Sequence, residues 1–563
     1  MTEPVDTFHE GYAAYRSGDY SRARTLLRTS RQPQAVHLLG LVERRSGNYT
    51  DASRWLTRAA ELEPTNHEIP HNQALLALDT GNAGQAEQFC HVALSLNSEF
   101  FTARNTLARA LRLQKRWQEA RVLYEHQLAI DPANVVAHFG MATVLLETGD
   151  AELARAALDA LIAAHPDDAA MLFMRGRAHQ ELGQLTAAVA DYQASHALEP
   201  TGHTLRVLTN LLWMTDDLQG VDRLLEAAGS IPTLLSTRAE LLRERGTPDD
   251  AVVAVQATSI QELGADELAV LALAQIDRNE PDAAMQSAQQ ALNIEPTHPL
   301  ATSALITGLL MQGKGDQALE LIYPMRRSDP LGQHWIAYEA TALRLCRPRD
   351  YAQLTDLDKF VRSFELPTPP GYRSLQHFNE VFLSELKSHH HYKSHPLNQS
   401  LRNGSQTSRD LRGIDRQVIQ DYFAALDTPI RQYLEAVGDS ADHPLTARNN
   451  GTYEFAGCWS VLLHGTGRHI NHVHPEGWIS SAYYVSVPAE CEDETAKSGW
   501  IKFAEPPFAT TPPSPPQKWL QPRAGLVVLF PSFMWHGTTP IANRSFRVTA
   551  PFDLVPGTVQ PPG

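Results

Sequence analysis

The 563-residue sequence has few cysteines and no long apolar run, and these absences exclude several classes of protein. No stretch of about 18 uninterrupted apolar residues predicts a membrane-spanning helix, and the N-terminus lacks the basic start and apolar core of a signal peptide. The four cysteines lie too far apart for a disulfide framework or a CxxC zinc or redox motif; they are Cys90, Cys346, Cys458 and Cys491. We therefore predict a cytoplasmic protein with reduced thiols and no membrane partner.

Positive charge is scarce as well. The sequence has 48 Lys and Arg against 64 Asp and Glu, a formal net charge of -16, and no dense basic run. A nucleic acid or an anionic membrane surface is therefore a poor candidate partner. The length exceeds the roughly 250 to 300 residues at which single cores stop growing, so at least two structural units are expected.

Over its first two thirds the sequence contains a repeat with a period of 34 residues. Proline, glycine and alanine each recur in one phase: Pro64, Pro132, Pro166 and Pro200; Gly47, Gly81, Gly149 and Gly183; Ala52, Ala86, Ala120, Ala154 and Ala188. Each unit is predicted to be two amphipathic helices, in which the glycine turns the chain, the alanine allows close packing and the proline ends the second helix. The spacing resembles that of the tetratricopeptide family.

The period is lost between Pro200 and Pro296, which lie 96 residues apart, and it returns at Gly313, Ala318 and Pro330. We predict a helical repeat array over residues 8–345, with shortened, degenerate helix pairs at about 205–290. Such arrays usually bind peptides or partner proteins along a concave surface, and some serve as spacers or dimerisation arms. The pattern leaves the oligomeric state open.

Helical periodicity ends at residues 364–374, where FELPTPPGYRS contains three prolines and a glycine. We predict a connector at residues 346–375 and a second domain at residues 376–556 that begins with helices. The first of these helices is followed by His389, His390 and His391. Adjacent histidines point in different directions and cannot jointly ligate one ion, so a solvated surface run is the preferred interpretation.

After residue 450 the pattern changes to short apolar stretches and alternation with a period of two, in CWSVLL, ISSAYYVSV, GWIKFA, GLVVLF and SFRVTAPFDL. This pattern predicts a β-domain, either a barrel or a double-layered sheet. His472 and His474 lie two residues apart just before one of these strands. Both side chains therefore leave the same face of an extended chain and can converge on one metal ion.

A third histidine and an arginine complete the set of candidate residues. His536 follows the apolar strand GLVVLF, 62 residues after His474, and its imidazole can reach the same ion from a second strand end. Arg547 opens the strand RVTAPFD, where its guanidinium can hold a carboxylate bidentately, because an unpaired arginine deep in a barrel is costly. Together these elements predict one pocket.

The order HxH, SSAYYV, GLVVLFPSxxWHG and RVTAPFD resembles the 2-oxoglutarate and Fe(II) dependent oxygenases, over roughly residues 370–556. With the segment HPLNQSLRNGSQT it is similar to bacterial oxygenases of this kind joined to tetratricopeptide repeats. The resemblance implies a double-stranded β-helix (jelly-roll or cupin-like) domain, with Fe(II), 2-oxoglutarate and O2. It makes His472 and His536 the catalytic iron ligands and Arg547 the partner of the distal carboxylate of 2-oxoglutarate.

The sequence departs from the wider superfamily at one position. The superfamily places Asp or Glu two residues after the first histidine, whereas this chain has His474. Either His474 binds iron in a three-histidine set, which we favour, or it stays outside the coordination shell and water or a carboxylate such as Glu476 completes the site. A neutral ligand set carries one negative charge fewer than the usual set. The metal site should therefore bind the anionic co-substrate more tightly.

Two further features each allow two interpretations. Tyr483 and Tyr484 are adjacent on a strand and face opposite sides. The inward one, for which Tyr484 is the candidate, either contacts 2-oxoglutarate through its hydroxyl or packs in the core. The proline-rich stretch EPPFATTPPSPPQKW is most simply an exposed, stiff loop and less simply a lid.

The leading hypothesis is a dioxygenase that hydroxylates a peptide or protein side chain bound by the repeat array. An alternative is a repeat adaptor whose β-domain only senses or stores a metal, which the unusual His474 favours. A third hypothesis, a cupin-like metalloprotein that acts without 2-oxoglutarate, shares the histidines but gives no purpose to Arg547.

Overall fold

The computed structural model describes residues 7–30, 32–542 and 545–558. The chain forms two compact units, Met1–Leu198 and Glu199–Gly563. A helical solenoid precedes an antiparallel β-domain, so the predicted fold class is confirmed at this level. Among the described residues, no helix has both the length and the apolar character needed to cross a membrane.

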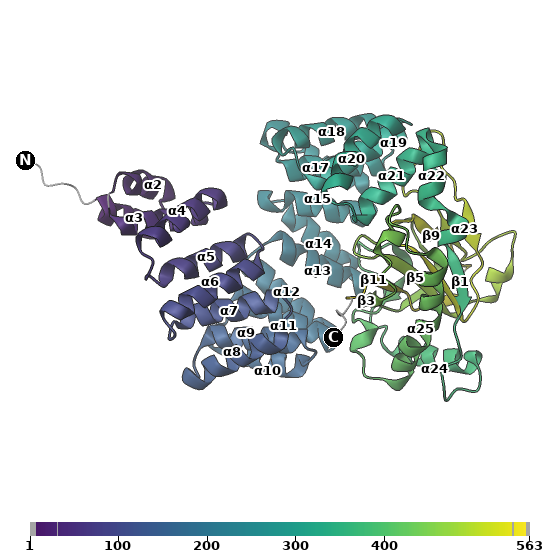
Figure 1. Ribbon diagram of the computed structural model, residues 1–563, viewed down its shortest axis with the longest axis horizontal. Helices are drawn as coiled ribbons and strands as arrows, with labels where there is room; N and C mark the ends of the chain where they lie inside the picture. The colour runs from purple at the N-terminus through teal and green to yellow at the C-terminus, as the bar shows by residue number, and fades with distance from the viewer. Residues whose placement is uncertain (1–6, 31, 543–544, 559–563) are drawn as a thin grey trace, which may run out of the picture. The chain divides into compact units, whose positions relative to one another are not determined.

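Unit 1 is a series of antiparallel helix pairs (Figure 1). Its helices are α1 (Thr7–Arg16), α2 (Tyr20–Thr29), α3 (Pro33–Arg45), α4 (Tyr49–Leu62), α5 (Glu68–Asp79), α6 (Ala83–Leu96), α7 (Phe101–Leu113), α8 (Trp117–Ile130), α9 (Val135–Glu147), α10 (Ala151–Ala164), α11 (Ala169–Glu181) and α12 (Leu185–Leu198). The four glycines of the period have φ between 70° and 91°, the left-handed conformation that turns the chain between paired helices. The alanines of the period are fully buried, as close helix packing requires. Both predicted roles are confirmed.

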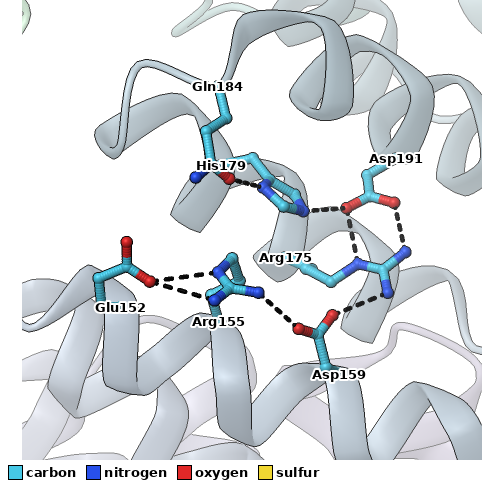
Figure 2. Close-up of polar contacts among 7 residues, drawn as sticks. All are labelled: Glu152, Arg155, Asp159, Arg175, His179, Gln184 and Asp191. Atoms are coloured by element: carbon cyan, nitrogen blue, oxygen red, sulfur yellow. Dashed lines mark hydrogen bonds and ion pairs between the residues drawn. The ribbon is translucent and has the colours of Figure 1, made fainter.

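A network of ion pairs joins helices α10, α11 and α12 (Figure 2). Arg175 donates hydrogen bonds of 2.8 and 2.6 Å to the Asp191 carboxylate and one of 3.1 Å to Asp159. Arg155 pairs with the same Asp159 at 2.8 Å. The hydrogen bonds to Asp191 raise the pKa of Arg175. Because the Asp191 side chain is only 8% exposed, Arg175 neutralises a carboxylate that is largely withdrawn from water.

Replacing Arg175 with methionine should lower the free energy of unfolding of unit 1 by about 2 kcal/mol, because the Asp191 carboxylate loses its charged partner. Arg155→Met is the matched control. The Arg155 side chain is 30% exposed and its partners are 41% and 64% exposed, so its loss should cost less than about 1 kcal/mol. Urea unfolding of the fragment 1–198, followed by circular dichroism, measures both values. Equal losses for the two variants would contradict this account of the network.

Unit 2 begins with further helix pairs. They are α13 (Gly202–Met214), α14 (Leu218–Ala228), α15 (Leu235–Glu244), α16 (Pro248–Gln256), α17 (Ala265–Asp277), α18 (Pro281–Ile294), α19 (Pro299–Met311), α20 (Gly315–Ser328) and α21 (Gln333–Cys346), with 3-10 turns η1 (Pro232–Leu234) and η2 (Ile260–Glu262). Helices α14, α15 and α16 span 11, 10 and 9 residues, compared with 13 or 14 for α17 to α21. The short helices lie where the 34-residue period is lost.

The rest of unit 2 contains two antiparallel sheets. The strands are β1 (Arg362–Glu365), β2 (Leu401–Gln406), β3 (Tyr453–Cys458), β4 (Val461–His469), β5 (Ile479–Ser486), β6 (Ile501–Phe503), β7 (Lys518–Leu520), β8 (Leu526–Pro531), β9 (His536–Thr538), β10 (Phe546–Thr549) and β11 (Phe552–Pro556). The larger sheet has the order β1-β8-β5-β10-β4-β2, and β11 pairs with both β3 and β5. The smaller sheet has the order β7-β6-β9.

Helices α24 (Leu375–Ser388) and α25 (Gln417–Val437) pack on the larger sheet. Their buried aromatic side chains Phe378, Phe382 and Tyr422 share a core with Tyr483 of β5. The Tyr422 hydroxyl donates a 2.6 Å hydrogen bond to the carbonyl of Ala550. Successive residues of a strand alternate between its faces. The residues next to Tyr483 on β5 therefore face away from these two helices.

The repeat helices of unit 2 pack directly on the β-domain. Trp535, between β8 and β9, is 7% exposed and donates its indole N–H to the Thr341 hydroxyl of α21 at 2.9 Å. Arg344, one turn further along α21, donates to the carbonyl of Ala504 at 2.6 Å. These contacts satisfy buried polar groups on both sides, so α21 is part of the structural support of the β-domain.

The proline-rich stretch at residues 505–519 is exposed only in part, because some of its residues pack against the same helices. The Phe508 ring stacks on Tyr338 of α21 with a centroid distance of 6.0 Å. At Gly313, which has a φ of 75°, an added Cβ would lie 2.2 Å from the carbonyl oxygen of Thr511. Glycine is therefore required where the stretch crosses the helix pair.

The predicted connector, residues 346–375, is itself structured. It contains α22 (Pro348–Thr355), α23 (Leu357–Phe360) and strand β1, which pairs antiparallel with β8. The histidine run after α24 also differs from its preferred interpretation. His390 has its two ring nitrogens 2.8 and 3.0 Å from the hydroxyls of Ser405 and Ser460, and burial lowers its pKa to about 4. The prediction of a solvated surface run is wrong for His390.

Candidate metal centre

Three of the histidines that the sequence predicts as metal ligands lie together. The candidate ligand atoms of His472, His474 and His536 are all within 4.8 Å of one another, and their ring centroids are 4.2 to 5.1 Å apart. Within the described part of the chain, no other group of three or more His, Cys, Asp or Glu has this arrangement. The spacing of the two motifs therefore predicted a real convergence in space.

Backbone hydrogen bonds fix the segments that bear these side chains. His472 and His536 exchange N–H to carbonyl bonds of 2.9 and 3.1 Å, and the N–H of His474 donates to the carbonyl of Ser532 at 3.0 Å. On its other side, His536 pairs with Phe503 in the smaller sheet. Main-chain hydrogen bonds thus hold each of the three segments, although His474 itself lies between strands β4 and β5.

Each imidazole uses Nδ1 for a hydrogen bond to an oxygen. In His472 and His536, Nδ1 lies 2.8 and 3.0 Å from the carbonyl oxygen two residues earlier in the chain. In His474, Nδ1 lies 2.7 Å from both carboxylate oxygens of Asp553. Carbonyl and carboxylate oxygens only accept, so Nδ1 donates and each neutral ring keeps a lone pair on Nε2. These three Nε2 atoms are available to a metal ion.

The Nε2 atoms of His472 and His474 lie 3.2 Å apart. With both Nδ1 atoms protonated, two lone pairs face each other at this distance, which is unfavourable unless a cation binds them. Burial, reinforced by His474, lowers the pKa of His472 to about 3, and burial holds the pKa of His536 well below its ordinary value. A divalent metal ion between these nitrogens fits the donor set.

Asp553 holds His474 in place, although the sequence analysis gave this residue no role. Its carboxylate also accepts a 2.7 Å hydrogen bond from the hydroxyl of Ser480, which lies 2.8 Å from the hydroxyl of Ser532. Asp553 and Ser480 are cross-strand neighbours on β11 and β5. Asp553 lies within the motif RVTAPFD, but it is 79 residues from His474 in sequence. No local spacing could have connected the two.

Ser400 and His469 are two further residues that the sequence analysis missed. The Ser400 hydroxyl lies 3.1 Å from His472 Nε2 and 3.0 Å from His469 Nδ1. Ser400 immediately precedes β2, in the polar segment after α24, and the next residue, Leu401, pairs with His469 on β4. This segment therefore closes one side of the histidine cluster.

The histidines line a cavity of about 950 Å³. Tyr484 and Arg547 line the same cavity from the β-domain. Arg243 and Asp277, at the ends of helices α15 and α17, line it from the repeats of unit 2. The candidate metal ligands and the candidate carboxylate-binding arginine thus share one cavity with two repeat helices.

Arg547 is buried without a carboxylate partner among the described residues. It is 2% exposed; Nη1 donates to the carbonyl of Gly499, while Nε has no hydrogen-bond partner in the described part of the chain. Burial lowers the pKa of Arg547. Withdrawing a charge from water costs several kcal/mol, by order of magnitude, unless an opposite charge pairs with it. A ligand carboxylate in the cavity would supply that charge.

The two adjacent tyrosines face opposite sides, as predicted. Tyr484 lines the cavity, and the guanidinium carbon of Arg547 lies 5.7 Å from the centroid of its ring. Tyr483 instead donates its hydroxyl to the amide oxygen of Asn379 on α24, inside the core. Tyr484 is therefore the one of the pair that a ligand of Arg547 can meet.

Parts of the chain match models of two known protein families. Residues 457–553, which include the three histidines, Arg547 and Asp553, match the family described as "Putative 2OG-Fe(II) oxygenase". Residues 8–67, 111–175 and 169–201 match models described as "Tetratricopeptide repeat". The chain thus carries tetratricopeptide repeats, followed by a β-domain in which residues 457–553 match an oxygenase family model.

The chain is similar to the protein FlbA of Caulobacter vibrioides, with 27% identity over 182 residues, which are 32% of this chain and 30% of that protein. It therefore spans about 30% of the curated relative that it matches. Solved structures similar to the chain include MamA from Desulfovibrio magneticus RS-1, with 20% identity over 30% of this chain and 97% of MamA and a TM-score of 0.26. Another is a tetratricopeptide repeat protein from Parabacteroides merdae, with 17% identity over 43% of this chain and 98% of that chain and a TM-score of 0.29. A third is yeast Tom70, with 14% identity over 63% of this chain and 97% of that chain and a TM-score of 0.29.

The residues of the β-domain fit the groups named in the description of the matched family. Three Nε2 lone pairs suit Fe(II), since imidazole is a common iron ligand, and the buried Arg547 suits a carboxylate of 2-oxoglutarate. Glu476, the carboxylate alternative to His474 as a ligand, lines the cavity but is not in the group of converging ligand atoms. Of the two ligand sets left open by the sequence, this geometry favours the one with three histidines.

Proposed function

We propose that this chain is an Fe(II)- and 2-oxoglutarate-dependent dioxygenase that hydroxylates a side chain of a peptide or protein bound by the repeat array. The strongest support is that one cavity contains three histidines whose candidate ligand atoms converge and a buried arginine without a carboxylate partner among the described residues. A metal alone explains the histidines, whereas Arg547 needs an anionic ligand. This combination favours the dioxygenase over a cupin-like metalloprotein that acts without 2-oxoglutarate.

The protein's own part in the reaction is binding and orientation. His472, His474 and His536 would hold the metal through Nε2, with each ring fixed by its Nδ1 hydrogen bond. Arg547 holds the distal carboxylate of the co-substrate by charge-assisted hydrogen bonds, beside the ring of Tyr484. When bound, Fe(II) and 2-oxoglutarate supply the oxidising chemistry, in which O2 inserts one oxygen atom into a C–H bond and the co-substrate leaves as succinate and CO2.

A peptide substrate agrees with the cavity walls. Arg243, Glu244 and Asp277 of the repeats line it together with the histidines, and Arg243 pairs with Asp277 at 3.1 Å. Charged side chains on repeat helices offer hydrogen bonds to an incoming polypeptide, and tetratricopeptide repeats generally bind other proteins. We infer that one side chain of the bound peptide enters the cavity from these helices.

The full-length protein should convert 2-oxoglutarate to succinate when Fe(II) and O2 are present together, and this conversion tests the proposal. Succinate is measured by mass spectrometry after mixing. Zn(II) in place of Fe(II) is the control, because zinc has no redox chemistry and should give no succinate. If the iron-loaded protein binds 2-oxoglutarate but forms no succinate, the result supports the adaptor hypothesis, in which the β-domain only stores or senses a metal.

Deleting residues 1–198 should weaken the stimulation of succinate release by a peptide digest of cell extract, because the array loses the repeats of unit 1 while those of unit 2 still line the cavity. Uncoupled release should stay close to the full-length rate. Unit 2 keeps Thr341 and Arg344, which contact the β-domain, so its site is preserved. A deletion of residues 1–345 would remove both contacts and is the matched destabilised control. Full stimulation of the fragment 199–563 would contradict the role of unit 1 in capture.

A further inference from the structure

The three-histidine cluster lacks the negative charge that a carboxylate ligand supplies in the usual two-histidine set. All three rings donate from Nδ1 and present a neutral Nε2. A divalent ion bound by three neutral ligands is less well neutralised than one bound by two histidines and a carboxylate. A carboxylate close to the ligands could compensate for this difference.

Asp553 is such a carboxylate, and it contacts one ligand only. Both of its oxygens lie 2.7 Å from His474 Nδ1, on the far side of the ring from Nε2. Its side chain is 14% exposed, as is that of His474. The third polar contact is the hydroxyl of Ser480, which donates at 2.7 Å. Asp553 is thus largely withdrawn from solvent, and both of its carboxylate oxygens contact His474. His474 is the residue that stands where the usual set has a carboxylate.

The position of this pair in the sheet is also specific. The residue that departs from the superfamily pattern, His474, is the one that contacts a carboxylate, whereas His472 and His536 donate to uncharged carbonyls. The backbone fixes both partners, because His474 N–H is bonded to Ser532 and Asp553 pairs with Ser480 across β11 and β5. The negative charge of Asp553 therefore lies one imidazole ring away from the candidate coordination shell.

We propose that Asp553 is a positioning residue that supplies the missing negative charge of the metal site through His474, so that the His474–Asp553 pair replaces the carboxylate ligand. A carboxylate hydrogen-bonded to Nδ1 raises the basicity of Nε2 and fixes the ring orientation. The pair acts as one negatively charged ligand toward the metal. This inference rests on the proposed function only in that the site binds a divalent metal.

The full-length protein with Co(II) as the probe tests the inference without turnover. Asp553→Asn keeps the shape of the side chain and its acceptor oxygen but removes the charge, and it should weaken Co(II) binding about 10- to 100-fold. Ser480→Ala, which removes only the other hydrogen bond of Asp553, should change the affinity by less than about threefold. Glu476→Gln removes a carboxylate that lines the same cavity without joining the ligand group, and it should leave the affinity unchanged.

A spectroscopic signature and a rescue separate charge supply from simple packing. The visible absorption bands of bound Co(II) should shift in Asp553→Asn and stay in place in Ser480→Ala. Adding His474→Asp to Asp553→Asn returns a carboxylate to the coordination shell and should recover Co(II) affinity to within about tenfold of wild type.

Three results would overturn the inference: wild-type affinity in Asp553→Asn, an equal loss in Glu476→Gln, or no recovery in a double variant that retains the wild-type circular dichroism spectrum. Wild-type protein that binds Co(II) as expected but never forms succinate with Fe(II) would overturn the proposed function and leave the role of Asp553 intact. The two failures are therefore distinguishable.

Discussion

Arg547→Met should raise the dissociation constant of 2-oxoglutarate by about 100-fold, because loss of a buried, charge-assisted partner costs roughly 2 to 5 kcal/mol. Arg547 is 2% exposed and has no carboxylate partner among the described residues. In the free protein, this substitution removes a desolvated charge and should not destabilise the domain. The loss should therefore appear in co-substrate binding and not in folding.

The measurement is calorimetric titration of 2-oxoglutarate into Co(II)-loaded protein without O2. Arg468→Met serves as the control, since Arg468 lies on β4 but does not line the cavity. This variant should bind 2-oxoglutarate with the affinity of the wild type. Co(II) affinity should be the same in both variants. A wild-type dissociation constant for Arg547→Met would contradict the assignment and favour a metalloprotein that acts without this co-substrate.

His472→Ala and His474→Ala should each weaken Co(II) binding by roughly 100-fold or more, which exceeds the 10- to 100-fold expected for loss of a supporting contact. The physical reason is that each variant removes one of three converging nitrogen donors. His469→Gln is the matched control, because His469 is a half-buried neighbour of His472 outside the ligand group. It should weaken Co(II) binding less than about tenfold. Affinities come from competition with a chromophoric chelator.

The His474 variant resolves the choice between a three-histidine set and a set completed by water or Glu476. A loss equal to that of His472→Ala supports direct ligation. If His474→Ala binds Co(II) as well as wild type does, His474 is not a ligand and the inference on Asp553 fails with it. Circular dichroism of each variant distinguishes loss of a ligand from loss of folding.

The sequence was sufficient for the features that depend on local spacing. A period of 34 residues requires helix pairs, because glycine, alanine and proline each have a conformational or packing role at a fixed offset. The alternation in the last hundred residues requires strands. His472 and His474 share a face because a strand has a period of two, and His536 and Arg547 stand at the ends of neighbouring apolar stretches.

The sequence was insufficient for contacts between distant segments. Asp553 reaches His474 across 79 residues, and Ser400 reaches His472 across 72. Both contacts depend on strand register, which hydrophobic patterning does not specify for single polar residues. The proline-rich stretch looked exposed because its composition is typical of loops, yet Phe508 docks on Tyr338. His390 looked solvated for the same reason, although two hydroxyls enclose its ring.

The central claim is best tested by admitting O2 to an anaerobic complex of the full-length protein with Fe(II) and 2-oxoglutarate and measuring the succinate formed. Wild type should bind both ligands and form succinate, whereas His536→Ala, which lacks one of the three nitrogen donors, should form almost none. Succinate at the wild-type rate in His536→Ala, or failure of the wild type to bind either ligand, would contradict the account.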